Sequence, residues 1–195
     1  MNVLDVIKTR RSIRKFLNKD VEKVKLEQIL LAGQYAPSGG NNQTNHFIVI
    51  MNKEVLSKLT LLVQDEFSKM EFVEGMYKSL KSSIIQSKKG GYCFHYNAPI
   101  LIVVANKKNY GNAMADASCA LENMMLMARE LELGSCWINQ LRWLNENDNI
   151  VSFMSKLGLK DDEVICGSLS LGYYDGDYNT LGLLERKGNP VTYIE

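Results

Sequence analysis

Apolar residues recur every three or four positions in several stretches of the chain, and this spacing predicts helices. A short helix is expected after Asn2, which can act as its N-cap with Asp5 at the capping-box position. A second candidate cap, Asn52, predicts another helix directly after it. Further helices are expected over residues 25–35, 76–87, 112–133 and 145–157.

Short runs rich in β-branched or apolar residues predict strands over residues 47–50, 100–105, 135–138 and 164–173. Strands and helices alternate, so the class is α/β or α+β, and the sequence leaves the order of the strands open. The longest predicted helix, residues 112–133, has apolar side chains on nearly every side and is expected to be buried nearly all round. Gly134 is the expected C′ residue that follows it.

No internal repeat and no linker rich in proline, glycine or serine divides the chain, so residues 1–195 are expected to form one domain. The C-terminal arm, residues 181–195, contains apolar residues such as Leu184 and Val191 without a helical period. An arm of this kind is poorly suited to bury itself within its own chain, and docking on a second copy would bury it. The arm therefore favours a homodimer.

The composition is that of a soluble globular protein, with 46% hydrophobic and 23% charged residues among 195. The 23 Lys and Arg nearly balance the 22 Asp and Glu, and a net charge of +1 argues against a general nucleic-acid binder. No apolar run approaches the length of a membrane span, and the N-terminus lacks the pattern of a signal peptide. We therefore expect no membrane association and a cytoplasmic location.

The four cysteines are scattered without a CxxC pair and are expected to be buried free thiols. The two histidines, His46 and His95, lie far apart and have no Cys, Asp or Glu at metal-ligand spacing. The sequence therefore predicts no metal site.

A basic segment near the N-terminus, residues 10–15, places Arg10, Arg11, Ser12 and Arg14 close together in sequence at the end of the first predicted helix. Guanidinium groups bind phosphate through paired hydrogen bonds, and a serine hydroxyl can complete such a site. The alternative is a solvated basic turn that balances the helix dipole. Composition alone favours this alternative, so the choice depends on the rest of the chain.

The loop at residues 36–43 combines glycines, which let backbone amides approach a ligand, with serine and amide side chains. It matches neither the P-loop nor the Rossmann fingerprint. The chain also contains no Gly-x-Ser-x-Gly elbow, no H-E-x-x-H helix and no paired-carboxylate motif. An anion site and a polar loop without an evident nucleophile suggest that a bound cofactor carries the reactive atoms.

Four separated stretches, taken in order, resemble the FMN-dependent nitroreductase superfamily and in particular its short-chain members. They are the basic segment with Phe16, the polar loop with the strand after it, the long helix leading into residues 134–138, and residues 157–163 leading to 171–173. The likeness spans nearly the whole chain. It implies an α+β fold with a central, mostly antiparallel sheet surrounded by helices, in an intertwined homodimer with FMN at the subunit interface.

The same resemblance implies roles for individual residues of the basic segment. Arg10 and Ser12 would hold phosphate and ribityl oxygens of FMN, and Arg11 would reach the phosphate. Arg14 would lie toward the pyrimidine ring, where a positive charge stabilises the reduced flavin. Arg186, which with Lys187 resembles a basic pair near the family's C-terminus, would complete the phosphate site.

Two further segments would complete the site by this resemblance. The loop of the other subunit would line the ribityl chain and the ring edge through Pro37, Ser38, Gly39 and Asn41. The end of the third predicted strand would offer a backbone N–H to flavin N5 from the run Ile138, Asn139 and Gln140.

The chain departs from the pattern at residues 139–141, where many relatives of this length carry Gly-Gly-Phe. Asn139, Gln140 and Leu141 are expected to place larger side chains beside the reactive face and to affect substrate access. Residues 71–97 resemble the variable segment that caps the site in relatives. Its candidate wall residues are aromatic rings, and packing at the surface or in the core is the alternative explanation for each: Phe72, Tyr77, Tyr92, Phe94, His95 and Tyr96.

The implied function is that of an NAD(P)H-dependent flavin oxidoreductase. FMN would pass reducing equivalents from NADH or NADPH to a small acceptor, such as a nitroaromatic, a quinone or another flavin, in a ping-pong reaction without a catalytic side chain. Two alternatives keep the flavin: a non-catalytic FMN store or sensor, and another reaction of the superfamily such as reductive dehalogenation. A third is a basic domain that recognises an acidic protein partner.

Overall fold

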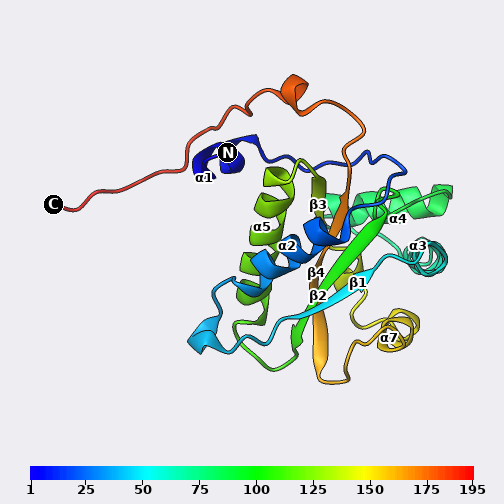
Figure 1. The fold of residues 1–195 in the computed structure, drawn as a ribbon. Helices are drawn as coiled ribbons and strands as arrows, with labels where there is room; N and C mark the ends of the chain where they lie inside the picture. Colours follow the sequence, from blue (N-terminus) through cyan, green and yellow to red (C-terminus); the bar gives the residue numbers. More distant parts are fainter.

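The computed structural model describes all 195 residues and is built around one four-stranded sheet (Figure 1). The strands are β1 (His46–Ile50), β2 (Ile100–Lys107), β3 (Gly134–Ile138) and β4 (Glu163–Gly172). Their order across the sheet is β1-β2-β4-β3, and every neighbouring pair is antiparallel. The predicted α+β class with an antiparallel sheet surrounded by helices is therefore confirmed.

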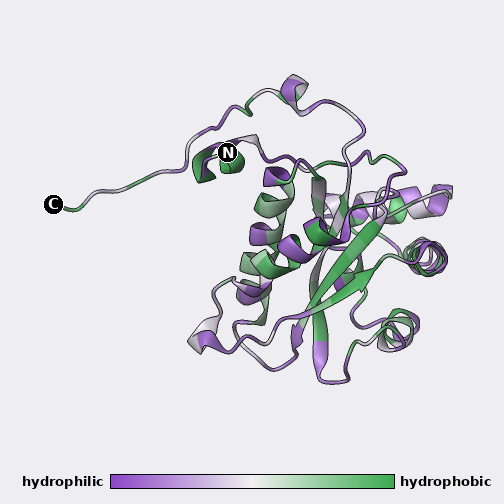
Figure 2. Cartoon of the chain, in the orientation of Figure 1, coloured by the Kyte–Doolittle hydropathy of each residue, from purple (hydrophilic) through white to green (hydrophobic).

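The strand period of two sends the side chains of β2 into two separate cores. One core lies against α3 (Lys53–Ser68), α4 (Lys78–Lys89), α6 (Gln140–Trp143) and α7 (Asp148–Ser155) and receives Leu101, Val103 and Ala105. The other lies against α2 (Lys23–Gln34) and α5 (Ala113–Glu130) and receives Ile100, Ile102 and Val104. Figure 2 shows the resulting, mostly hydrophobic sheet between helices that carry both hydrophobic and hydrophilic residues. The two layers of helices thus cover opposite faces of the sheet.

Both predicted asparagine caps are confirmed. Asn2 Oδ1 accepts a hydrogen bond from the Asp5 N–H at 3.0 Å, at the start of α1 (Val3–Thr9). Asn52 Oδ1 accepts from the N–H groups of Glu54 and Val55 at 3.0 and 3.1 Å. Each side chain thereby satisfies donors that the first helical turn leaves without an internal partner.

The predicted role of Gly134 as the C′ residue of α5 is wrong. The residue with left-handed backbone is Glu132, with φ of +61°, and the Leu133 N–H donates to the Ala128 carbonyl at 2.8 Å, as in a Schellman ending. Gly134 is the first residue of β3. A Cβ atom at Gly134 would lie 2.8 Å from Ile13 Cγ2, so glycine lets the N-terminal segment approach the strand.

The expectation that α5 is buried nearly all round is also wrong, as is the burial of all four thiols. Cys119 on α5 is exposed and Cys93 is partly exposed, whereas Cys136 and Cys166 are buried. Within one chain, α5 packs on the sheet, on α2 and on α1, and these contacts leave Cys119 exposed.

Apolar surface is exposed at both ends of the chain. Residues 182–195 form no helix or strand and extend away from the sheet (Figure 1), with Leu183 69% and Ile194 95% exposed. On α1 only Val6 is buried, while Val3 and Leu4 face solvent. No helix has both the length and the apolar character needed to span a membrane.

Replacing the α3 cap, Asn52→Ala, is expected to lower the free energy of unfolding by about 1 kcal/mol, because two N–H groups lose their acceptor. Urea unfolding at a fixed protein concentration measures this change. The control Asn52→Asp keeps an acceptor and should stay within about 0.3 kcal/mol of the parent. Equal stability of the alanine variant and the parent would contradict the capping role.

Candidate functional site

The basic segment runs beside the edge strand β3. Ser12 forms an isolated parallel bridge with Ser135, and the Ile13 N–H donates to the Ser135 carbonyl at 2.9 Å. Side chains of an extended segment alternate between its two sides. Arg11 and Ile13 are accordingly buried, whereas Ser12 and Arg14 are exposed. Pairing with β3 therefore sorts the basic residues into an inward and an outward set.

Arg11 belongs to the inward set, and its guanidinium group is hydrogen-bonded to backbone carbonyls. Its Nη1 donates to the carbonyl oxygens of Lys8 and Arg10, each at 2.8 Å, and its Nη2 donates to the Gly182 carbonyl. The buried Nε has no partner. Arg11 thus fastens the start of the C-terminal arm to the basic segment, and its guanidinium does not face solvent.

Several positive charges converge around Arg11. Burial lowers the pKa of its guanidinium from the usual value, and the charges of three neighbours lower it further: Arg186, Arg10 and Arg129. Among these four arginines one ion pair forms, between Arg10 Nε and Glu122 Oε1 on α5 at 3.6 Å. Four guanidinium groups with one ion pair among them create a local excess of positive charge, which suits an anion.

Arg14 belongs to the outward set and lies over an aromatic ring. Its guanidinium carbon is 5.8 Å from the centre of the Tyr96 ring, within reach of a cation–π interaction. Burial acts to lower the pKa of Arg14, but the neighbouring Cys136 and Tyr96 side chains outweigh it and the pKa is raised. Arg14 is therefore a positive charge at the surface, at the point where the basic segment meets the turn that carries Tyr96.

The larger side chains after β3 turn inward or back on the strand. Gln140 and Leu141 are buried, and the Asn139 Oδ1 accepts a hydrogen bond from Trp137 Nε1 at 2.9 Å. The expectation that these side chains stand beside a reactive face is therefore not met for Gln140 and Leu141. They pack into the protein because α6 begins at Gln140 and presents its apolar side to the core.

The polar loop is held by a buried carboxylate. The Gly39 N–H donates to Asp116 Oδ1 and Oδ2 at 3.1 and 3.3 Å, and the Tyr110 hydroxyl lies 2.9 Å from Asp116 Oδ2. Asp116 is 4% exposed and lies in the first turn of α5. Within the loop, Gly40 and Asn41 adopt left-handed backbone with φ of +58° and +54°. A rigid loop at one end of α5 results.

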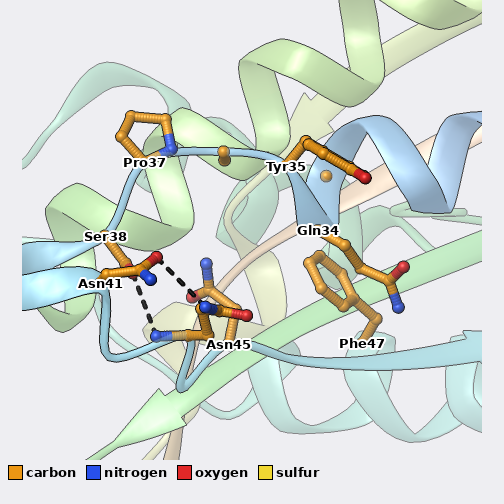
Figure 3. A pocket seen from close by; sticks show the side chains of 10 residues that line it. Gln34, Tyr35, Pro37, Ser38, Asn41, Asn45 and Phe47 are labelled. Carbon is orange, nitrogen blue, oxygen red and sulfur yellow. Dashed lines mark hydrogen bonds between the residues drawn. The ribbon is translucent and has the colours of Figure 1, made fainter.

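A cavity of about 670 Å³ lies beside this loop (Figure 3). Three of the four predicted loop residues line it, namely Pro37, Ser38 and Asn41, together with the aromatic rings of Tyr35 and Phe47. Gly39 does not line it, because its N–H faces Asp116. Hydroxyl and amide groups beside aromatic surface suit a ligand that has both polar atoms and a flat ring.

The predicted site residues form two separate groups in one chain. The first group is Arg10, Ser12 and Arg14 beside β3, with Ile138 at the end of this strand, Asn139 directly after it, and Arg186 near Arg11. The second is the loop, and no hydrogen bond or ion pair joins it to the first group. The first group lies near the last turn of α5, where Arg129 Nε donates to Thr9 Oγ1. The loop is held by Asp116 in the first turn of the same helix. At about 1.5 Å per residue, these two α5 positions lie about 20 Å apart along the helix axis.

Sequence reasoning missed three residues that organise these groups. Arg129 adds a positive charge from the last turn of α5, and Asp116 and Tyr110 hold the loop. A charged residue within an otherwise apolar helical stripe was the available signal for Asp116, because such a carboxylate needs a buried partner. The sequence offered no comparable signal for Tyr110, whose partner lies in a distant loop.

Adding a methyl group at the loop anchor, Gly39→Ala, is expected to destabilise the protein by about 1–3 kcal/mol. The added Cβ would lie 2.5 Å from the Tyr110 hydroxyl oxygen and would also overlap the Asn112 amide. The matched control is Gly111→Ala, where no atom lies within 4 Å of the added Cβ and a change below about 0.5 kcal/mol is expected. Thermal unfolding of both variants at one protein concentration gives the comparison, and equal shifts would refute the tight packing at Gly39.

Comparison with known proteins gives consistent matches. The model of the nitroreductase family matches residues 7–173. A curated protein of Archaeoglobus fulgidus, provisionally named NADH dehydrogenase/NAD(P)H nitroreductase, is 30% identical over 87% of this chain and 84% of its own length. Among solved structures, a nitroreductase with bound FMN from Bacteroides fragilis superposes with a TM-score of 0.84 and 33% identity over 100% of both chains. A second FMN-bound nitroreductase, from Desulfitobacterium hafniense, gives a TM-score of 0.79 and 26% identity, also over 100% of both chains.

Proposed function

This chain belongs to the nitroreductase family, and we propose that it is an FMN-dependent oxidoreductase that takes electrons from NADH or NADPH and delivers them to a small acceptor. The acceptor classes that suit this chemistry are nitroaromatics, quinones and free flavins. The bound FMN of the two similar crystal structures supports the choice of cofactor. The provisional name of the archaeal relative supports the choice of donor.

The observation that carries the proposal is the convergence of guanidinium groups around Arg11. The phosphate of FMN is a dianion at neutral pH, and guanidinium donors bind such a group through charge-assisted hydrogen bonds. We assign Arg10, Ser12 and Arg186 to the phosphate and ribityl oxygens, because they stand on the outward side of the segment or on the exposed arm. Arg11 adds its charge and holds the arm that brings Arg186 to the group.

When bound, FMN would supply the redox chemistry that links a nicotinamide donor to the acceptor. The chain's own residues bind and orient the group and tune its potential. Arg14, which is exposed on the outward side of the basic segment, would place its positive charge near the part of the flavin where negative charge accumulates on reduction. The backbone of residues 138–140 runs past the ring in this proposal, and no side chain needs to act as a general base.

The proposal requires two chains. The cavity beside the loop, lined by Pro37, Ser38 and Asn41, would complete the site of a partner subunit, with Gly39 holding the loop in place. Exposed apolar residues on α1 and on the C-terminal arm support such an intertwined homodimer, because association would bury them. Each site would then combine the basic segment of one subunit with the loop of the other.

The absorbance spectrum of the purified protein, supplied with FMN if colourless and then mixed anaerobically with NADPH or NADH, tests the proposal. We expect the spectrum of bound oxidised flavin and its bleaching by at least one of the two donors. Flavin that binds without bleaching would contradict the proposed donor and favour a store, a sensor or a different electron source. Failure to bind FMN would overturn the proposal as a whole.

The substitution Arg14→Ala is expected to lower the flavin reduction potential by about 10–30 mV, equivalent to roughly 0.5–1.4 kcal/mol for two electrons. The cause is the loss of the positive charge that stabilises the reduced form. Arg14→Lys keeps the charge and should retain most of the potential. Equilibrium titration against a redox dye measures all three proteins, and an unchanged potential in Arg14→Ala would remove the tuning role.

A further inference from the structure

A buried polar cluster connects α6 to α4 and to the residues that follow α4. Gln140 Nε2 donates to the Tyr92 hydroxyl oxygen at 2.9 Å and to Ser83 Oγ at 3.3 Å. The Tyr92 hydroxyl and Ser83 Oγ are themselves 2.9 Å apart. The Tyr92 N–H donates to Gln64 Oε1 on α3 at 2.6 Å. Tyr92 is thus fixed at both its backbone and its hydroxyl end.

This cluster is not explained by stability alone. Gln140 is 7% exposed, and its Oε1 is buried without a hydrogen-bond partner. A leucine would fill a similar volume without leaving a buried carbonyl oxygen unpaired. Buried polar networks fix one arrangement of the groups they join, at an energetic cost when a member is unsatisfied. The amide of Gln140 therefore points to a need for a defined geometry at this position.

The segment that begins at Tyr92 leads to Arg14 in the basic segment. Its backbone forms a tight turn, in which the Tyr96 N–H donates to the Cys93 carbonyl at 3.1 Å and Tyr96 and Asn97 have φ of +59° and +57°. Phe94 is fully buried and anchors the turn in the core. Tyr96 is partly buried against the same core, and its ring lies beneath the Arg14 guanidinium.

We propose that Gln140 is a positioning residue that, through Tyr92, holds the turn at residues 92–97 as a fixed wall of the flavin site and so restricts the size of the electron acceptor. The turn is attached at one end to Gln140, beside residues 138–139, and at the other to Arg14. Both attachment points are assigned to the flavin under the proposed function, on which this inference rests. The turn therefore spans between two flavin-contacting segments of one chain.

The hydrogen bond between Gln140 and the Tyr92 hydroxyl is the strut that holds the turn. The first test variant, Tyr92→Phe, removes only this hydroxyl group. Flavin content should be unchanged, because no phosphate-binding residue is altered, while the visible circular dichroism of the bound flavin should change. The photoreduced flavoprotein is then mixed anaerobically with 1,4-benzoquinone or with the bulkier menadione. The rate-constant ratio of menadione to benzoquinone should rise by about threefold or more, because the wall is no longer fixed. Photoreduction makes this readout independent of the nicotinamide donor.

The matched control is Ser87→Ala on the same helix. Ser87 is as buried as Ser83, and its Oγ has no partner, so its removal leaves the strut intact. The ratio of the two quinones should stay at the parent value in this variant. An equal rise in both variants would show a general loosening of α4 and would overturn the specific role of Tyr92.

A double-mutant cycle with Gln140→Leu tests whether the two residues act as one unit. If Gln140 acts through Tyr92, the double variant should show the same quinone ratio as either single variant, because one broken strut cannot be broken again. Changes that multiply would overturn the proposal. An unchanged ratio in both single variants would do the same.

Hydrogen–deuterium exchange of the flavin-free protein separates failure of this inference from failure of the proposed function. The amides of residues 92–97 should exchange about tenfold faster in Tyr92→Phe than in the parent, with no such change in Ser87→Ala. This outcome supports the strut even if FMN is not the cofactor. Unchanged exchange in Tyr92→Phe would overturn the strut even in a protein that binds and reduces FMN.

Discussion

The length and rigidity of α5 determine how the candidate site can be assembled. One face of this helix packs on β2 and β4 through a continuous apolar stripe, so it cannot bend or slide without opening the core. Its first turn carries Asp116, which holds the polar loop, and its last turn carries Arg129, which contacts the basic end of α1. This packed helix therefore keeps the polar loop apart from Arg129 and the basic segment beside it within one chain.

Strand alternation determines which side chains of the basic segment face solvent. The period of two that divides β2 between two cores also acts on the short segment beside β3. It turns Arg11 inward onto backbone carbonyls and turns Ser12 and Arg14 outward. A run of basic residues that could have been a solvated turn thereby becomes one inward anchor and a set of outward donors, joined by the arm through the Gly182 carbonyl.

The parts of the fold that depend on local sequence were predictable. Helix caps at Asn2 and Asn52 and the apolar runs of the four strands were read correctly, because each depends on neighbours within a few residues. The errors concern relations between distant segments. Gly134 serves close packing against Ile13 rather than a helix end, and the exposed side of Cys119 reflects a face that the single chain does not cover. Neither feature can be read from the local sequence pattern.

In the candidate site too, features that depend on local sequence were predictable and relations between distant segments were not. The basic segment and the polar loop were found from residue types at short spacing, whereas the inward turn of Arg11 depends on pairing with a strand more than a hundred residues later. The anchor at Asp116 and the strut from Gln140 to Tyr92 likewise join segments that are distant in sequence. Residue types thus suggested the candidate segments, and tertiary contacts determine which of their side chains are available to a ligand.

The central claim, that each site combines the basic segment of one subunit with the loop of another, is tested most directly by flavin binding to a mixed dimer. One chain carries Arg10→Ala with Ser12→Ala, the other carries Ser38→Ala with Asn41→Ala, and different affinity tags isolate the dimer that contains both. Each variant homodimer should bind FMN weakly, whereas the mixed dimer should regain one site of parental affinity, formed by the intact half of each chain. Binding no stronger than in the two homodimers would contradict the shared site and confine the flavin to a single chain.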